Sequence, residues 1–227
     1  MSLNKQASVM VCLVFICAGH AARAECRQAN QFKIEVEVSA DPVETVFNTS
    51  LEELARLAHA AGRDAHTPLR AVYGSTVVFR ADIQSEVRAS DVNTFCAIAR
   101  SIHIRVAIGK RQIHAARELR ERPCLLAAAR DHALAHAQYQ QKNLGEAKQR
   151  MSSSLMARLQ RGMPETNSAS EAERILARAV SAQIDSDLAE IDAEGTESGR
   201  APDSPEVLAR LRDICPAEQA DLLRERT

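Results

Sequence analysis

The chain has 227 residues, with 29 basic and 30 acidic side chains that give a net charge of −1 at pH 7. This balance leaves no basic excess, which argues against a nucleic-acid partner. Trp is absent and only two Tyr and five Phe are present, so a core must be built from Ala, Leu, Ile and Val. Burial per residue is then modest, and covalent cross-links gain importance for stability.

The N-terminus predicts a signal peptide over residues 1–24. Lys5 supplies the positive start, and residues 9–19 form the apolar run. Residues 22–24 read Ala-Arg-Ala, which fits a small-residue cleavage site. The run is too short for a bilayer-spanning helix, which needs about 20 residues. We therefore expect an exported protein, periplasmic or secreted, with no integral membrane span.

The mature chain is expected to form a single exported α+β domain over residues 25–227. Its first part, 30–122, is rich in strand patterns, and its second part, 123–215, is helical. Cleavage removes two basic residues and no acidic ones, so 27 basic side chains remain against 30 acidic ones and the net charge becomes −3.

The first half predicts strands and one short helix. Residues 32–38 alternate apolar and charged side chains, the pattern of a strand with one wet face. Ser50 followed by Glu53 resembles a capping box and opens a helix over residues 51–61. Residues 71–81 are rich in β-branched and aromatic side chains, which favour another strand.

A β-hairpin is expected between residues 102–108 and 112–119. The first segment alternates cleanly between apolar and polar side chains, and residues 109–111 (Gly-Lys-Arg) supply a turn. The second segment can then return as the partner strand. The N-terminal half is thus predicted to hold a small antiparallel sheet.

Two long amphipathic helices and a short third helix are predicted to follow. Apolar residues recur at spacings of three and four over residues 125–161 and again over 172–191, with Pro164 between them. Residues 194–202 are expected to form a loop. The Asp-Ser-Pro-Glu sequence at the start of residues 203–215 then opens the last helix.

Four cysteines remain after cleavage, at positions 26, 96, 124 and 215. In an exported chain they predict two disulfides, with three possible connectivities, and their spacing does not fit a zinc-thiolate site. Cys96 and Cys124 are mirror positions about Lys110 in the expected turn, which favours a Cys96–Cys124 bridge across the hairpin. The remaining pair is then Cys26–Cys215, joining the two ends of the mature chain.

His132 and His136 stand four residues apart on the first long helix. In a zinc-protease helix of the pattern H-E-x-x-H, two histidines so spaced bind the metal, and the glutamate after the first one activates the metal-bound water. That position is Ala133 here, which cannot transfer a proton. The pattern predicts a zinc site without its base, although two packing histidines on the edge of a buried helix face would have the same spacing.

The chain from Phe95 to the C-terminus resembles a family of small exported bacterial proteins described as predicted secreted zinc-dependent proteases. The likeness lies in the order of features: a cysteine before an alternating strand, Cys124 opening a long helix, a two-histidine motif eight residues later, and a late Asp-Ser-Pro-Glu helix ending in cysteine. It implies an α+β domain with zinc held by His132 and His136. Ala133 departs from the family's glutamate, and loss of a general base lowers the rate about 10²–10⁴-fold.

The sequence identifies no third zinc ligand. Candidates are acidic residues of the second long helix and one histidine of the expected return strand: Glu171, Glu173, Asp185, Asp187 and His114. Asp131 can orient the neighbouring His132 from outside the ligand set, and a helix-terminus charge interaction explains it equally well.

Three functions are therefore open. The first is a catalytically inactive, protease-like protein that binds an unknown protein or peptide in the periplasm. The second is a zinc-dependent peptidase that takes its base from elsewhere in the chain. The third is a metal-free interaction protein whose long helices pair with a partner. Metal content separates the first two from the third.

Overall fold

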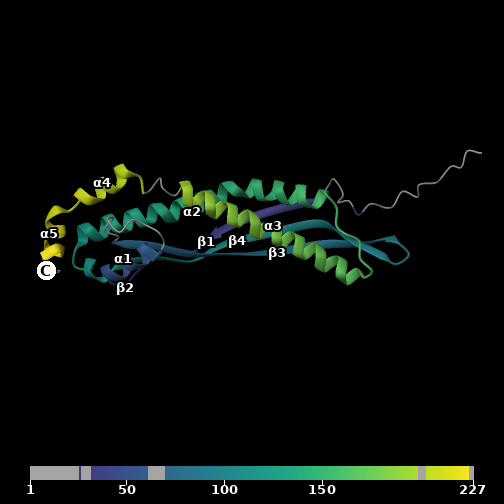
Figure 1. The fold of residues 1–227 in the computed structure, drawn as a ribbon, viewed down its shortest axis with the longest axis horizontal. Helices are drawn as coiled ribbons and strands as arrows, with labels where there is room; N and C mark the ends of the chain where they lie inside the picture. Colours follow the sequence, from purple (N-terminus) through teal and green to yellow (C-terminus); the bar gives the residue numbers. More distant parts are fainter. Residues whose placement is uncertain (1–25, 27–31, 61–69, 199–202, 225–227) are drawn as a thin grey trace, which may run out of the picture.

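The computed structural model describes residue 26 and residues 32–60, 70–198 and 203–224. The signal peptide predicted over residues 1–24 lies outside them. The described residues form an α+β fold in which a four-stranded sheet precedes two long helices and short C-terminal helices. Figure 1 shows an elongated molecule with both long helices running along the sheet.

The central strand is β4 (Thr94–Ala116), which pairs with all three other strands. β3 (Ala71–Asp91) joins it through a turn at residues 92–93 and runs antiparallel. β1 (Lys33–Ala40) and β2 (Glu44–Thr49) pair with it in parallel, one after the other along its opposite edge. The expected antiparallel sheet is therefore wrong for β1 and β2, because alternation within a strand does not encode its partner's direction.

The expected hairpin between residues 102–108 and 112–119 is also wrong, because residues 109–111 form a bulge within a continuous β4. Between the two cross-strand pairs that flank this point, β4 contains one residue more than β3. Lys110 takes a φ of 49° at the bulge. The extra residue reverses which side chains face inward, so that Arg111 is buried although its alternation with Ile108 predicts an outward position.

The helices α2 (Pro123–Gln160) and α3 (Ala169–Ser198) confirm the two predicted long helices. α3 continues through residues 194–198, where a loop was expected to begin. The main core lies between these helices and the sheet, and its buried apolar residues come from alternate positions of β4 and one stripe of each helix. They include Ile102, Ile104, Val106, Ile108, Leu144, Met151, Leu155, Leu159, Leu176, Val180 and Ile184.

Three short α-helices and one 3-10 helix, η1 (Arg117–Leu119), complete the described fold. α1 (Leu51–Ala60) begins as predicted at Ser50, whose hydroxyl accepts a first-turn N–H at 3.1 Å. α4 (Pro205–Asp213) begins in the same way at Ser204, with a hydrogen bond of 3.3 Å. α5 (Pro216–Arg224) follows directly and was not predicted. Within the described residues, no helix is long and apolar enough to cross a membrane.

The two disulfides join Cys26 to Cys96 and Cys124 to Cys215. The predicted pairs, Cys96–Cys124 and Cys26–Cys215, are therefore wrong. They depended on a hairpin at residues 109–111, but the continuous β4 carries the chain about 65 Å from Cys96 before it turns toward α2. The presence of two disulfides itself agrees with the prediction and is typical of extracytoplasmic proteins.

Candidate metal centre

Three side chains from two distant segments bring potential metal-binding atoms together. His132 and His136 lie on α2, and Asp203 immediately precedes Ser204 at the start of α4. Oδ1 of Asp203 lies 3.0 Å from Nε2 of His132 and 3.1 Å from Nε2 of His136. The two Nε2 atoms are 3.3 Å apart. Asp203 is thus the third candidate ligand that the sequence did not reveal.

These distances suit three ligands of one ion. Ligands placed about 2.0–2.1 Å from a tetrahedral zinc ion lie about 3.3 Å from one another. The observed triangle is nearly equilateral, with edges of 3.0, 3.1 and 3.3 Å. If hydrogen bonds alone explained the cluster, two ring N–H groups would have to donate to the same carboxylate oxygen. The angle between the two donors at that oxygen would be acute, which is narrower than the angle between its lone pairs. The triangle also leaves one tetrahedral position for water or another ligand.

The three side chains combine low exposure with convergent geometry. His132, His136 and Asp203 are 15%, 19% and 27% exposed. The imidazole rings stand almost perpendicular, with an interplanar angle of 87° and centroids 4.9 Å apart. The partial burial strengthens electrostatic attraction between an ion and the carboxylate, while the remaining exposure leaves a route for the ion to enter.

A buried arginine fixes the position of α2 next to the site. Arg111, 7% exposed, donates hydrogen bonds to the carbonyl of Ala137 at 3.2 Å and to that of Asp41 at 2.8 Å. Its Nε donates to the hydroxyl of Tyr73 at 3.1 Å. Because Ala137 directly follows His136, these hydrogen bonds anchor α2 at the position of the second histidine. The bulge in β4 is what turns Arg111 inward toward α2.

Ala133, at the position of the missing base, faces an apolar core. Its exposure is 1%, and it belongs to a second hydrophobic cluster beneath the first half of α2. The other buried members come from α1, the sheet, the 3-10 helix η1 (Arg117–Leu119) and the start of α2: Leu51, Leu54, Ala71, Ile113, Ala115, Ala116, Leu119, Leu125 and Ala129. A glutamate here would have to place its carboxylate among these side chains or displace them.

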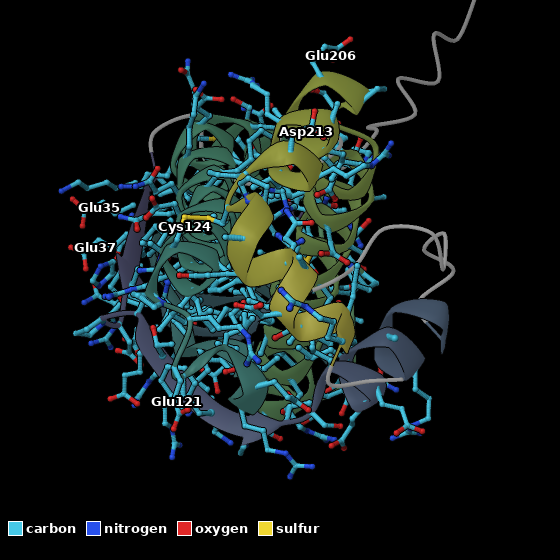
Figure 2. All side chains as sticks on the ribbon, turned by 90° about the vertical axis from the view of Figure 1, so that its left-hand side faces the viewer. Glu35, Glu37, Glu121, Cys124, Glu206 and Asp213 are labelled. Carbon is cyan, nitrogen blue, oxygen red and sulfur yellow. A yellow bond between two sulfur atoms is a disulfide. The ribbon has the colours of Figure 1, made fainter. Side chains whose placement is uncertain are left out.

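Asp203 is presented by residues 203–224, which we call the C-terminal arm. The Cys124–Cys215 disulfide fastens the arm to the first turn of α2. Glu218 adds a second link, because its carboxylate accepts two N–H groups at the start of α2, at 3.2 and 2.9 Å. Since α2 begins without a side-chain cap of its own, Glu218 serves as that cap. Figure 2 shows the arm at this end of the molecule, beside the disulfide of Cys124.

The third ligands considered from the sequence have other surroundings. These candidates are Glu171, Glu173, Asp185, Asp187 and His114. Asp187 is buried between α2 and α3, where its carboxylate accepts hydrogen bonds from Ser154 at 2.5 Å and Gln183 at 2.9 Å. The Nδ1 atom of His114 lies 3.3 Å from the amide oxygen of Asn48. Among the described residues, none of the five joins the cluster of His132 and His136.

Comparison with known proteins adds no family to this geometry. No protein-family model, curated protein or solved structure matches the chain. The resemblance to secreted zinc-dependent proteases therefore remains an expectation from the order of sequence features. What the site can do has to be argued from its donor atoms, their burial and their surroundings.

Proposed function

We propose that this chain is an exported zinc-binding protein that holds the ion between His132, His136 and Asp203. The observation that carries the proposal is the triangle of donor atoms, whose edges measure 3.0–3.3 Å. Two imidazoles and one carboxylate form the ligand set of zinc sites that keep a position open. Zinc can therefore bind here and still accept one donor atom from a protein or peptide.

The surroundings of the site favour binding over hydrolysis. A peptidase must remove a proton from the attacking water and deliver one to the leaving nitrogen. Ala133 cannot do either, and its 1% exposure within an apolar cluster leaves that side of α2 without a water-filled space for a base. We therefore assign the protein a binding role in a protease-like arrangement, with an unidentified protein or peptide as the partner.

Export is part of the proposal. The predicted signal peptide directs the chain out of the cytoplasm, and both disulfides persist only where the surroundings are oxidising. The same disulfides keep the four mature cysteines from competing with the histidines for zinc, because a thiolate is the metal-binding form of cysteine.

The test is the metal content of the mature protein, purified without a histidine tag. We expect about one zinc per chain, and none in the His132→Ala/His136→Ala variant. A matched control is His103→Ala/His114→Ala, which removes two histidines of the sheet and should retain the metal. Zinc-free wild-type protein, or equal zinc in the His132/His136 variant, would contradict the proposal.

A hydrolysis assay tests the non-catalytic part separately. Zinc-loaded wild-type protein and the His132→Ala/His136→Ala variant are incubated with casein and with a mixed peptide library. Equal background cleavage by the two proteins is expected, because no base stands at Ala133. Zinc-dependent cleavage by the wild type alone would leave the metal site intact and reject the binding-only role.

A further inference from the structure

We infer that the Cys124–Cys215 disulfide sets the zinc affinity of the site by holding Asp203 against the two histidines. Zinc binding would then respond to the redox state of this one disulfide. The inference rests on the proposed zinc site and adds a means of regulating it. It follows from how the C-terminal arm is attached to the rest of the protein.

The arm has little hydrophobic anchoring. Neither α4 nor α5 has a buried residue, and the apolar side chains of α4, Val207, Leu208 and Leu211, are only half-buried. One apolar side chain of α5, Leu222, packs against the cluster beneath the first half of α2, and it is only partly buried. Ile214 and Leu223 are 39% and 64% exposed. Because burial of apolar surface supplies most of the free energy that fixes an element, the position of this arm depends on a few specific links.

Those links are unequal. Glu218 accepts hydrogen bonds from the start of α2, and Arg70 donates one to the carbonyl of Leu211 at 3.2 Å. Each such bond can open and exchange with water. The disulfide is the covalent link, and it keeps Asp203 near the histidines at a high effective concentration even when the other contacts open.

The arm runs beside the first part of α2, with the disulfide at one end of the paired segments and the proposed zinc ligands at the other. From Cys124 to His136 the chain advances 12 positions, and from Asp203 to Cys215 it also advances 12. Along α2 this separation is about 18 Å. The arm returns antiparallel to α2, so fixing Cys215 at one end brings Asp203 opposite the histidines at the other.

The two disulfides differ in access to a reductant. Cys124 is exposed and Cys215 half-buried, whereas Cys96 in the other disulfide is only 2% exposed. A thiolate of a small dithiol can attack the Cys124–Cys215 bond to form a mixed disulfide, and its second thiol then closes a ring. Two electrons and two protons pass to the cysteines, which become thiols, while the dithiol becomes a cyclic disulfide. The arm is then released without loss of any ligand residue.

A double-mutant cycle tests whether the disulfide acts through Asp203. Zinc affinity is measured by competition with a chelating dye for wild type, Asp203→Asn, the Cys124→Ser/Cys215→Ser pair, and the three substitutions combined. Serine is chosen because free thiols beside Glu218 would form a second group of metal ligands. Asp203→Asn should weaken binding at least about tenfold in wild type but less than about twofold in the serine pair, which is itself weakened about tenfold.

The Cys26→Ser/Cys96→Ser pair is the matched control. It removes a disulfide near the other end of α2, about 55 Å from Cys124, and should leave zinc affinity unchanged. Circular dichroism melts check that each variant is folded. A second readout needs no variant: wild type is reduced with dithiothreitol, the freed thiols are blocked with iodoacetamide, and both reagents are removed before zinc is added. Zinc affinity should then fall in parallel with the extent of alkylation of Cys124, because blocked thiols cannot bind the ion themselves.

The outcomes separate the two claims. If wild type binds zinc through the histidines but the Cys124/Cys215 serine pair binds it equally tightly, the inference is wrong and the zinc site stands. The same holds if Asp203→Asn weakens binding equally with and without the disulfide, because the disulfide then acts only on overall stability. If wild type binds no zinc, both claims fall.

Discussion

The body of the protein and its C-terminal arm are held in place by different forces. In the body, α2 and α3 bury continuous apolar stripes against β4. In the arm, α4 and α5 bury no side chain completely, and their links to the body are a disulfide, a carboxylate cap, the polar cluster at Asp203 and the partly buried Leu222. The candidate metal centre takes its two histidines from the body and its aspartate from the arm. Two side chains anchored in the core are thus joined by one whose position depends on a disulfide and a few polar contacts.

The largest effect should come from placing a charge in the body beneath the metal centre. Ala133→Glu puts a carboxylate where the native side chain is 1% exposed among apolar residues. A fully buried carboxyl group has its pKa raised by up to about 3–5 units and is then protonated at pH 7, so we expect a loss of about 4 kcal/mol in unfolding free energy at that pH. Urea denaturation measures it.

Ala127→Glu is the matched control for that change. It makes the same substitution six residues earlier on α2, at an exposed position, and should alter stability by less than about 0.5 kcal/mol. A stable, zinc-dependent peptidase from Ala133→Glu would show that this side of α2 faces the metal. It would contradict the assignment of Ala133 to the apolar core.

A second comparison uses leucines of the two regions. Leu155 on α2 is 0% exposed in the main core, so Leu155→Ala should lower unfolding free energy by about 2–5 kcal/mol. Leu211→Ala in the arm removes a half-buried side chain and should cost less than about 1 kcal/mol. Chemical denaturation of both variants measures the difference. Equal losses would mean that the arm is part of the cooperative core.

The sequence predicts the body better than the arm for a physical reason. The stripe of α2 repeats within one segment, so Leu144, Met151 and Leu155 can be assigned to the core without knowing what they pack against. The Gly-Lys-Arg sequence at residues 109–111 suits a turn or a bulge equally. Either one changes which side of the sheet the following side chains face. Only the length of β3, which pairs along β4 on both sides of this point, decides for the bulge.

The candidate metal centre likewise has a part that the sequence predicts and a part that it does not. His132 and His136 are found from their spacing on one helix. Asp203 lies 67 residues from His136 in the sequence, and its approach depends on the disulfide that joins Cys124 to Cys215. With the hairpin misassigned, that pairing was predicted wrongly. Given the correct pairing, the equal separations of 12 residues would have placed Asp203 opposite the histidines.

Zinc should reduce the opening of the C-terminal arm and leave the body of the protein unchanged. Trypsin can cut α4 after the exposed Arg210 and Arg212 when the arm opens. Saturating zinc should slow these cuts at least about tenfold, because the ion binds only the closed arm. Mass spectrometry follows the cuts, with cleavage after Arg158 in α2 as the internal reference. In Asp203→Asn, zinc should give no such protection; protection there would assign the closing of the arm to other contacts.

The smallest effect is expected on the outer face of the sheet, where the body relies, as the arm does, on exposed polar links. Glu35 and Glu37 point away from the helices there (Figure 2), and nearby a hydrogen bond from Arg105 holds the pKa of Asp82 below its ordinary value of 3.8. Because folding lowers this pKa, the ionised carboxylate stabilises the fold above the ordinary value, and the contribution disappears as pH falls through the folded one.

Asp82→Asn tests this reasoning. Because both partners are solvent-exposed, the variant should lower Tm by less than about 2 °C at pH 7. The difference from wild type should shrink as pH is lowered into the range where Asp82 takes up its proton. The same measurements on Glu44→Gln, which removes an exposed carboxylate of β2, serve as the control. A loss at pH 7 as large as that of Leu155→Ala would mean that the outer face supports the body as strongly as the core does, and that exposure does not separate the strong contacts of this fold from the weak ones.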